Sequence, residues 1–276
     1  MTTPKKVIGP KDKTWSDIID INHFCTPESP AQTKTDRKFL REAKCFDIPF
    51  EGQVLKGYIW GEGRTVLLVH GWNSRASHLG FLARNLAKQG FRVAAFDAPA
   101  HAHSVIKGKE PRTNLPEFCR AIYHVAHFLG NVYGLIGHSF GGMAAAFTAA
   151  GQADLAGYRL EVEKLVMISS PSGIDRVISY YCRNHGLIAD AEIKIRELLE
   201  AEFPLRVDDF EVHDALKHIS CDVLVLHDKD DQEVAIEDVF PMINGHKHVK
   251  LVQTEGEGHR KILASRVLLK AIKEFM

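Results

Sequence analysis

The stretch GLIGHSFGGMAAAF, residues 134–147, decides the fold of this chain. An apolar run ends at Gly137, Ser139 follows after one residue, and Gly141 opens a run of small residues. This spacing predicts a strand that turns abruptly into a helix at Ser139. Glycine is needed on either side because a side chain there would collide with the neighbouring strand or helix. The serine hydroxyl would project above the sheet at a helix N-terminus, where N–H groups favour negative charge.

The composition is that of an ordinary globular protein. The 276 residues are 45% apolar and 25% charged, and the formal net charge is zero. A chain of this length can bury a sizeable core as one domain without disulfides or a structural metal. A neutral chain has no general attraction to nucleic acid or to an anionic membrane, so we expect neither as a partner.

The sequence lacks the features of secreted and membrane proteins. Its polar start, MTTPKKVIGPKDKTW, has no apolar core of a signal peptide, and no apolar run reaches the roughly 18 residues of a membrane span. The five cysteines are odd in number and form no C-x-x-C pair. These observations indicate a cytoplasmic protein with reduced thiols.

Apolar runs and amphipathic segments alternate from about residue 43 onward. Such alternation predicts a mostly parallel sheet covered by helices on both faces, the α/β class. We interpret residues 1–42 as an N-terminal extension and residues 43–276 as the main domain. The segment at about 174–216 is charged and has a helical pattern. It breaks the alternation and predicts a small lid. Strands are expected at 44–50, 55–61, 65–71, 91–99, 132–139, 163–171, 221–228 and 248–256, and helices at 77–90, 114–130, 140–151, 235–243 and 265–275.

Chemically active side chains follow three of the predicted strands. In a parallel sheet, catalytic and ligand-binding side chains gather beyond the carboxyl ends of the strands. Ser139 follows one strand, an acidic cluster follows another, and His259 follows the last. The cluster offers three candidate acids: Asp228, Asp230 and Asp231. Asp97 also follows a strand, and we interpret it as a residue that caps or braces the neighbouring loop.

These motifs resemble those of the α/β-hydrolase family. GHSFGG is similar to the family's turn around a catalytic serine, LLVHGW to its His-Gly loop, VLVLHDKDDQEV to its acid turn, and EGEGHRKIL to its histidine loop. FDAPAHAHS resembles the family's D-x-P-G-H-G-x-S loop. The chain departs from the family pattern at three positions, with Ala100 and Ala102 in place of two glycines and Asp228 in place of a third.

The resemblance implies a role for each of these residues. Ser139 would be the nucleophile, and His259 would take up its proton and later return one to the leaving group. Asp231 would orient the histidine, because it lies four residues after His227, as the family's acid usually does; Asp228 and Asp230 remain alternatives. The backbone N–H groups of Trp72 and Phe140 would form the oxyanion hole.

The function implied by the resemblance is hydrolysis of an ester or related acyl bond of a small substrate through an acyl-enzyme. Thioesterase, peptidase, carbon–carbon hydrolase and perhydrolase chemistries stay open, because a fold does not fix function. A non-catalytic ligand-binding protein on the same fold is the alternative from another class. Four residues of the predicted lid are expected to line an apolar pocket: Tyr180, Tyr181, Leu187 and Phe203.

Histidine pairs raise the question of a metal site. The 15 histidines include pairs at His101 and His103, His124 and His127, and His246 and His248. No cysteine or carboxylate completes a four-ligand set with the usual spacing. We therefore expect neither a metal nor a cofactor, and we expect the pair on the predicted helix 114–130 to pack in the fold.

Overall fold

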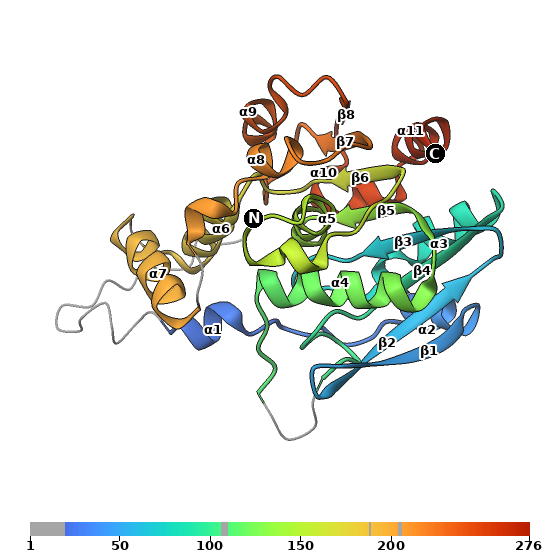
Figure 1. Ribbon diagram of the computed structural model, residues 1–276, viewed down its shortest axis with the longest axis horizontal. Coiled ribbons are helices and arrows are strands. Elements are labelled where there is room, and N and C mark those ends of the chain that lie inside the picture. The colour runs from blue at the N-terminus through green and yellow to red at the C-terminus, as the bar shows by residue number, and fades with distance from the viewer. Residues whose placement is uncertain (1–19, 106–109, 188, 204–205) are drawn as a thin grey trace.

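The computed structural model describes residues 20–105, 110–187, 189–203 and 206–276. At its centre is an eight-stranded sheet in the order β1-β2-β4-β3-β5-β6-β7-β8 (Figure 1). β2 runs antiparallel to both of its neighbours, and the pairs from β4 to β8 are parallel. The predicted mostly parallel sheet is therefore confirmed. The strands are β1 (Lys44–Phe50), β2 (Gln53–Trp60), β3 (Arg64–Val69), β4 (Phe91–Phe96), β5 (Val132–His138), β6 (Lys164–Ile168), β7 (Asp222–Asp228) and β8 (Val249–Thr254).

The central strands are apolar throughout because both of their faces are buried. In β3, Leu67 and Val69 enter one apolar cluster, whereas Val66 and Leu68 enter a second cluster on the opposite face. This two-residue alternation is what an extended strand imposes. The parallel strands all end at the same edge of the sheet, so the residues that follow them come together there.

Helices cover both faces of the sheet. The first cluster is formed with α4 (Leu115–Leu129), α5 (Phe140–Ala150), α8 (Val212–Leu216) and α9 (Val239–Ile243). The second is formed with α3 (Gly80–Ala87) and α11 (Arg266–Phe275). Asn114 caps the start of α4, where its side chain accepts the Glu117 N–H, and Gly151 ends α5 in a left-handed conformation.

Residues 20–42 are tied to the loops that carry the site. They contain α1 (Ile21–Cys25) and α2 (Lys34–Arg41). The Glu28 N–H donates to Oδ1 of Asn73 over 2.6 Å, and the Ala102 N–H donates to Oγ of Ser29 over 3.0 Å. The first 19 residues of the predicted N-terminal extension lie outside the described residues, and the extension as a separate unit stays a prediction.

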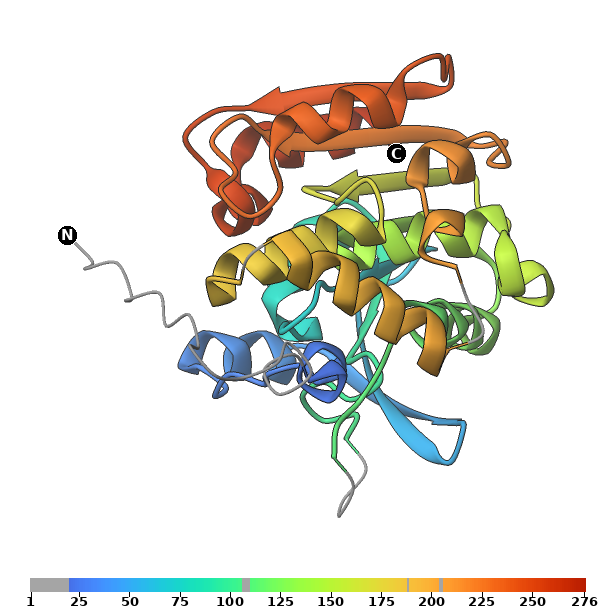
Figure 2. The same ribbon diagram turned by 90° about the vertical axis from the view of Figure 1, so that its left-hand side faces the viewer.

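The predicted lid region holds two longer helices, α6 (Ile174–His185) and α7 (Ala189–Glu202). α7 lies beside α1, so the lid region contacts residues 20–42, the N-terminal segment (Figures 1 and 2). Nδ1 of His23 and the Tyr181 hydroxyl lie 2.6 Å apart across this junction. Residues 188, 204 and 205 of the predicted lid lie outside the described residues.

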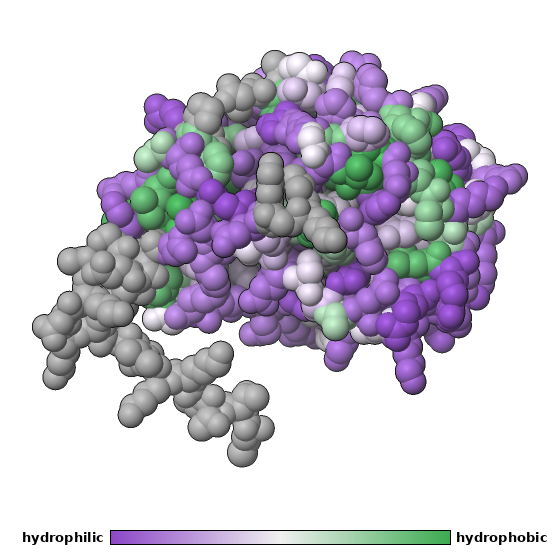
Figure 3. Space-filling view, turned by 90° about the horizontal axis from the view of Figure 1, so that it is seen from below, coloured by the Kyte–Doolittle hydropathy of each residue, from purple (hydrophilic) through white to green (hydrophobic). Residues whose placement is uncertain are grey.

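None of the helices in the described ranges has both the length and the apolar character that crossing a membrane requires. The face seen in Figure 3 is mostly hydrophilic, and its apolar side chains form separate small patches.

Candidate active site

Ser139 lies at a sharp turn between β5 and α5. Its φ of 53° and ψ of −127° are sparsely populated by residues other than glycine. A Cβ at Gly137 would come within 2.3 Å of the Gly141 carbonyl oxygen, and one at Gly141 would come within 2.3 Å of the His70 carbonyl oxygen. Both glycines are therefore required by close backbone contacts, which is the physical reason for the G-x-S-x-G spacing.

The loop after β3 closes over Ser139. A Cβ at Gly71 would come within 2.9 Å of the Ser139 Cβ, so only glycine allows this approach. The buried His70 holds the loop: its Nδ1–H donates to the Gly71 carbonyl over 2.7 Å, and its Nε2 accepts the Ala98 N–H over 2.9 Å. Burial lowers the pKa of His70 to about 4, so the ring stays neutral and keeps this pair of bonds.

Two backbone N–H groups lie near Ser139, those of Phe140 and Trp72. Phe140 is the first residue of α5, and Trp72 follows Gly71 in the adjoining loop. In the described part of the chain, no backbone or side-chain acceptor is bound to either N–H. N–H groups at a helix start have no partner within the helix and suit a negatively charged oxygen. The rings of the same two residues pack edge to face, with centroids 5.2 Å apart.

His259 pairs with Asp231. Nδ1 of His259 donates to Oδ2 of Asp231 over 2.8 Å, and Oδ1 of Asp231 accepts the N–H groups of Glu233 and Val234, each over 2.9 Å. Burial alone would raise the pKa of Asp231, but the hydrogen bond and charge of His259 and the two N–H donors outweigh it and lower that pKa. The ionised carboxylate favours the proton on Nδ1, and Nε2, on the other side of the ring, lies 3.7 Å from Oε2 of Glu233.

The other two candidate aspartates bind residues 254–258, which lead from β8 to His259. The buried Asp228 accepts the Thr254 hydroxyl over 2.6 Å and the Gly258 N–H over 2.9 Å. Asp230 accepts the Gly256 N–H over 2.8 Å. Neither contacts the His259 ring through a hydrogen bond. Asp97 is likewise buried; it accepts the Ala76 N–H from the neighbouring segment after β3 over 2.8 Å and the His103 N–H from its own loop over 3.2 Å.

Ser139 and His259 line the same cavity, whose volume is about 710 Å³. No hydrogen bond joins the Ser139 hydroxyl to the His259 ring in the described residues. Much of the wall is apolar and comes from the N-terminal segment, the sheet edge and the lid region: Phe24, Phe39, Trp72, Leu115, Phe140, Ile174, Tyr180, Tyr181, Leu199 and Phe203. Of the four predicted pocket residues, Leu187 is the exception. It follows the end of α6, packs against the first apolar cluster and is not among the residues that line the cavity.

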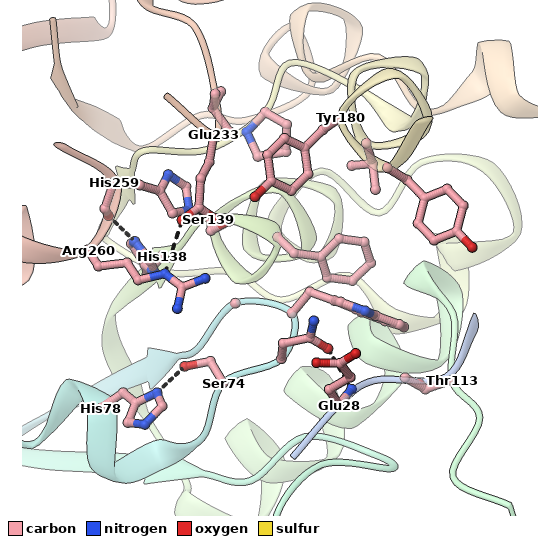
Figure 4. A pocket seen from close by; sticks show the side chains of 18 of the residues that line it. Glu28, Ser74, His78, Thr113, His138, Ser139, Tyr180, Glu233, His259 and Arg260 are labelled. Carbon is pink, nitrogen blue, oxygen red and sulfur yellow. Dashed lines mark hydrogen bonds and ion pairs between the residues drawn. The ribbon is translucent and has the colours of Figure 1, made fainter. Parts of the chain in front are cut away.

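Two charged residues that the sequence analysis did not select lie beside His259. Oε2 of Glu233 is 3.7 Å from Nε2 of His259, and Oε1 accepts Nε of Arg260 over 3.0 Å. Figure 4 shows Ser139, His259 and Glu233 gathered at one end of the cavity, with Arg260 alongside. Their positions in the sequence could have identified them, because Glu233 is two residues from Asp231 and Arg260 directly follows His259.

A second serine–histidine pair lines the same cavity. The Ser74 hydroxyl is 2.9 Å from Nδ1 of His78, and Nε2 of His78 lies 3.9 Å from Oδ1 of Asp36 (Figure 4). The described residues show a serine–histidine hydrogen bond here and not between Ser139 and His259, and this arrangement differs from the first in two further respects. The histidine–carboxylate distance exceeds a hydrogen bond, and Ser74 does not stand at the start of an α-helix.

The histidine pairs take part in local packing. On α4, His124 packs edge to face on Phe50, and His127 packs on Tyr123. His101 is fully buried beside His70, whereas His246 lies 3.2 Å from His213 at the far end of the sheet. Within the described ranges, no three His, Cys, Asp or Glu side chains are arranged to hold a metal ion.

Comparison with known proteins gives the same fold. The chain resembles esterase Pf2001 of Pyrococcus furiosus (TM-score 0.67, 23% identity, covering 91% of this chain and 97% of that one). It also resembles the ferulic acid-bound Est1E of Butyrivibrio proteoclasticus (TM-score 0.62, 19% identity, 83% and 98% covered). A third similar structure is the N-formylmaleamic acid deformylase of Pseudomonas putida S16 (TM-score 0.59, 17% identity, 83% and 100% covered). These identities establish a shared fold alone.

The curated protein sequences contain no match to the chain. The sequence profile of the alpha/beta hydrolase family, however, matches residues 66–267. This range includes the turn at Ser139, the acid loop after β7 and the loop that carries His259. The chain therefore belongs to the alpha/beta hydrolase family.

Proposed function

We propose that this protein is a serine hydrolase that cleaves an ester of an apolar carboxylic acid through an acyl-enzyme intermediate. The observation that carries the proposal is the 2.8 Å pair of His259 and Asp231 in the cavity that Ser139 lines. A serine hydroxyl is a weak nucleophile until a neighbouring base removes its proton, and the free Nε2 of His259 is such a base.

The reaction follows from this arrangement. Nε2 of His259 takes the Ser139 proton as Oγ attacks the carbonyl carbon, and the resulting oxyanion accepts the N–H groups of Trp72 and Phe140. The bond to the leaving oxygen then breaks, and His259 returns the proton to that oxygen. Water, activated by the same histidine, hydrolyses the acyl-enzyme and frees Ser139.

The apolar wall supports an apolar acyl group. Trp72 and Phe140 carry the oxyanion donors and also present their rings to the cavity, so an acyl chain leaving the carbonyl on this side meets aromatic surface. Beyond them, Leu199 and Phe203 of the lid region extend this surface. Burial of each methylene group contributes about 0.8 kcal/mol, so longer chains should bind more tightly until the wall is filled.

The test is hydrolysis of p-nitrophenyl esters from acetate to dodecanoate, with the wild type and Ser139→Ala. We expect turnover that rises and then falls with chain length, and loss of turnover in the variant. Phe203→Ala should shift the preferred length upward. The corresponding thioesters, measured in parallel, separate an esterase from a thioesterase. Absence of turnover with every ester and thioester would contradict the proposal.

A further inference from the structure

The two sides of Ser139 differ in character. On the oxyanion side, aromatic rings form the wall. On the side of His259, the nearest groups are charged: the Glu233 carboxylate lies 3.7 Å from Nε2 of His259, and Arg260 is bound to it. A cavity lined in this way separates an apolar part of a substrate from a polar part.

The chemistry fixes which part lies on the charged side. His259 returns its proton to the leaving oxygen, so that oxygen must lie next to Nε2 when its bond to the acyl carbon breaks. Whatever is attached to the leaving oxygen therefore extends past Glu233 and Arg260. This placement depends on the proposed function, because it uses the direction of proton transfer in the acyl-enzyme mechanism.

The Glu233 carboxylate is already engaged. One oxygen accepts Nε of Arg260 over 3.0 Å, and the other faces His259. Its side chain is 27% exposed, compared with 75% for that of Arg260. Glu233 therefore holds Arg260 at its inner nitrogen, and this ion pair offsets part of the negative charge that the carboxylate would otherwise present to a substrate.

The Arg260 guanidinium, by contrast, is free at its outer end. Within the described ranges no acceptor contacts either terminal nitrogen, and the side chain lines the cavity. In Figure 4 it extends from the His259 end of the cavity toward Ser74. Two parallel N–H donors in one plane match the two oxygens of a carboxylate or phosphate. Ser74, whose hydroxyl lies 2.9 Å from Nδ1 of His78, also lines this cavity.

We infer that Arg260, oriented by Glu233, binds an anionic oxygen group on the leaving alcohol. The substrate class is then an ester between an apolar acid and an alcohol or phenol that carries a carboxylate or phosphate. In each turnover, the acyl carbon–oxygen bond is exchanged for a bond to Ser139, and the proton of Ser139 leaves with the departing alcohol by way of His259. The anion stays on that alcohol, and Arg260 is a specificity residue that does not react.

The experiment compares hexanoate esters that share the acyl group and differ in the leaving phenol. The para substituent of the phenol is a carboxylate, a phosphate, the neutral methyl ester of the carboxylate, or a trimethylammonium group. kcat/KM is measured for each at low ionic strength, with the wild type, Arg260→Gln and the matched control Arg176→Gln. Arg176 also lines the cavity and is likewise paired through Nε, 3.4 Å from Oδ1 of Asp238, but it lies on α6 instead of next to His259. Comparing ratios between enzymes cancels the different intrinsic reactivities of the esters.

Arg260→Gln should lower the ratio of anionic to neutral ester by about five- to tenfold, as expected for loss of a charge-assisted hydrogen bond. Arg176→Gln should change it by less than about twofold, and the wild-type ratio should fall as salt is added. The carboxylate and phosphate arms show which anion is preferred.

Three results would overturn the inference while leaving the proposed function intact. They are an unchanged ratio in Arg260→Gln, an equal fall in both arginine variants, and a preference for the trimethylammonium ester that Glu233→Gln abolishes. Failure of the wild type to hydrolyse any of the four esters, with no labelling of Ser139 by a fluorophosphonate, would instead overturn the proposed function and the inference together.

Discussion

His138 donates a hydrogen bond from Nε2 to the backbone carbonyl of His259 over 2.8 Å. The two rings lie 4.9 Å apart between centroids, and His138 immediately precedes Ser139. One fully buried side chain therefore connects the turn that carries the serine with the loop that carries the histidine. We predict that His138, the variable position before Ser139 in the G-x-S-x-G motif, positions the proposed base.

Replacing His138 by Ala should lower kcat by about 10- to 100-fold with little change in KM, because the His259 loop loses its anchor and a small misplacement is costly. His138→Gln, whose amide N–H can still donate, should recover part of the loss. Steady-state kinetics of both variants, with circular dichroism to verify folding, checks this. Equal losses in the two variants would contradict a role for the hydrogen bond.

The choice among the three aspartates can be tested by neighbouring substitutions. Asp231→Asn should lower kcat by roughly 10³–10⁴, because an amide at this position no longer fixes the His259 proton on Nδ1. Asp230→Asn, the same change one residue away, removes a charge that is not hydrogen-bonded to the His259 ring, and the amide oxygen can still accept the Gly256 N–H, so it should cost less than about tenfold. If Asp230→Asn lost more activity than Asp231→Asn, the assignment of Asp231 as the acid would be wrong.

Two alanines occupy positions that favour glycine. Ala100 and Ala102 have φ values of 62° and 45°, the left-handed region, where a Cβ costs about 1–2 kcal/mol. We expect Ala102→Gly to raise the free energy of unfolding by about 0.5–1 kcal/mol, since greater freedom of the unfolded chain offsets part of the relief. Thermal unfolding measures the change. The reverse control is Gly52→Ala, at φ 79° with no atom near, which should be destabilised by a similar amount.

The buried neutral histidines should make the fold sensitive to acid. Burial lowers the pKa of His70 to about 4 and the pKa values of His101 and His138 to about 3. In the unfolded chain each titrates near 6.5, so below that pH the unfolded state binds more protons and stability falls toward the folded pKa. Each histidine contributes up to about 1.4 kcal/mol per pH unit in this window.

Urea unfolding between pH 7 and pH 4.5 checks this slope. His138→Gln should flatten it, because one titrating group is removed. A slope that is the same in the variant and the wild type would show that His138 is not held neutral in the fold.

The order of elements and the residues at the strand ends could be read from the sequence, because apolar periodicity and the glycine spacing at Ser139 are local signals. The pairing of Glu233 with Arg260 could not, since it forms between two loops that only the sheet brings together. The contacts by which residues 20–42 hold the loops of the site could not be predicted from the sequence either. They use backbone groups such as the Glu28 N–H, which every residue type carries. Leu187 was wrongly placed because apolar character alone does not distinguish a cavity wall from a core.

The most direct test of the central claim is mass-spectrometric mapping of a fluorophosphonate adduct on the wild-type protein. The account predicts one adduct, on Ser139, formed much more slowly in His259→Ala and absent in Ser139→Ala. An adduct on Ser74 instead of Ser139, or no adduct at all, would contradict the assignment of Ser139 as the nucleophile.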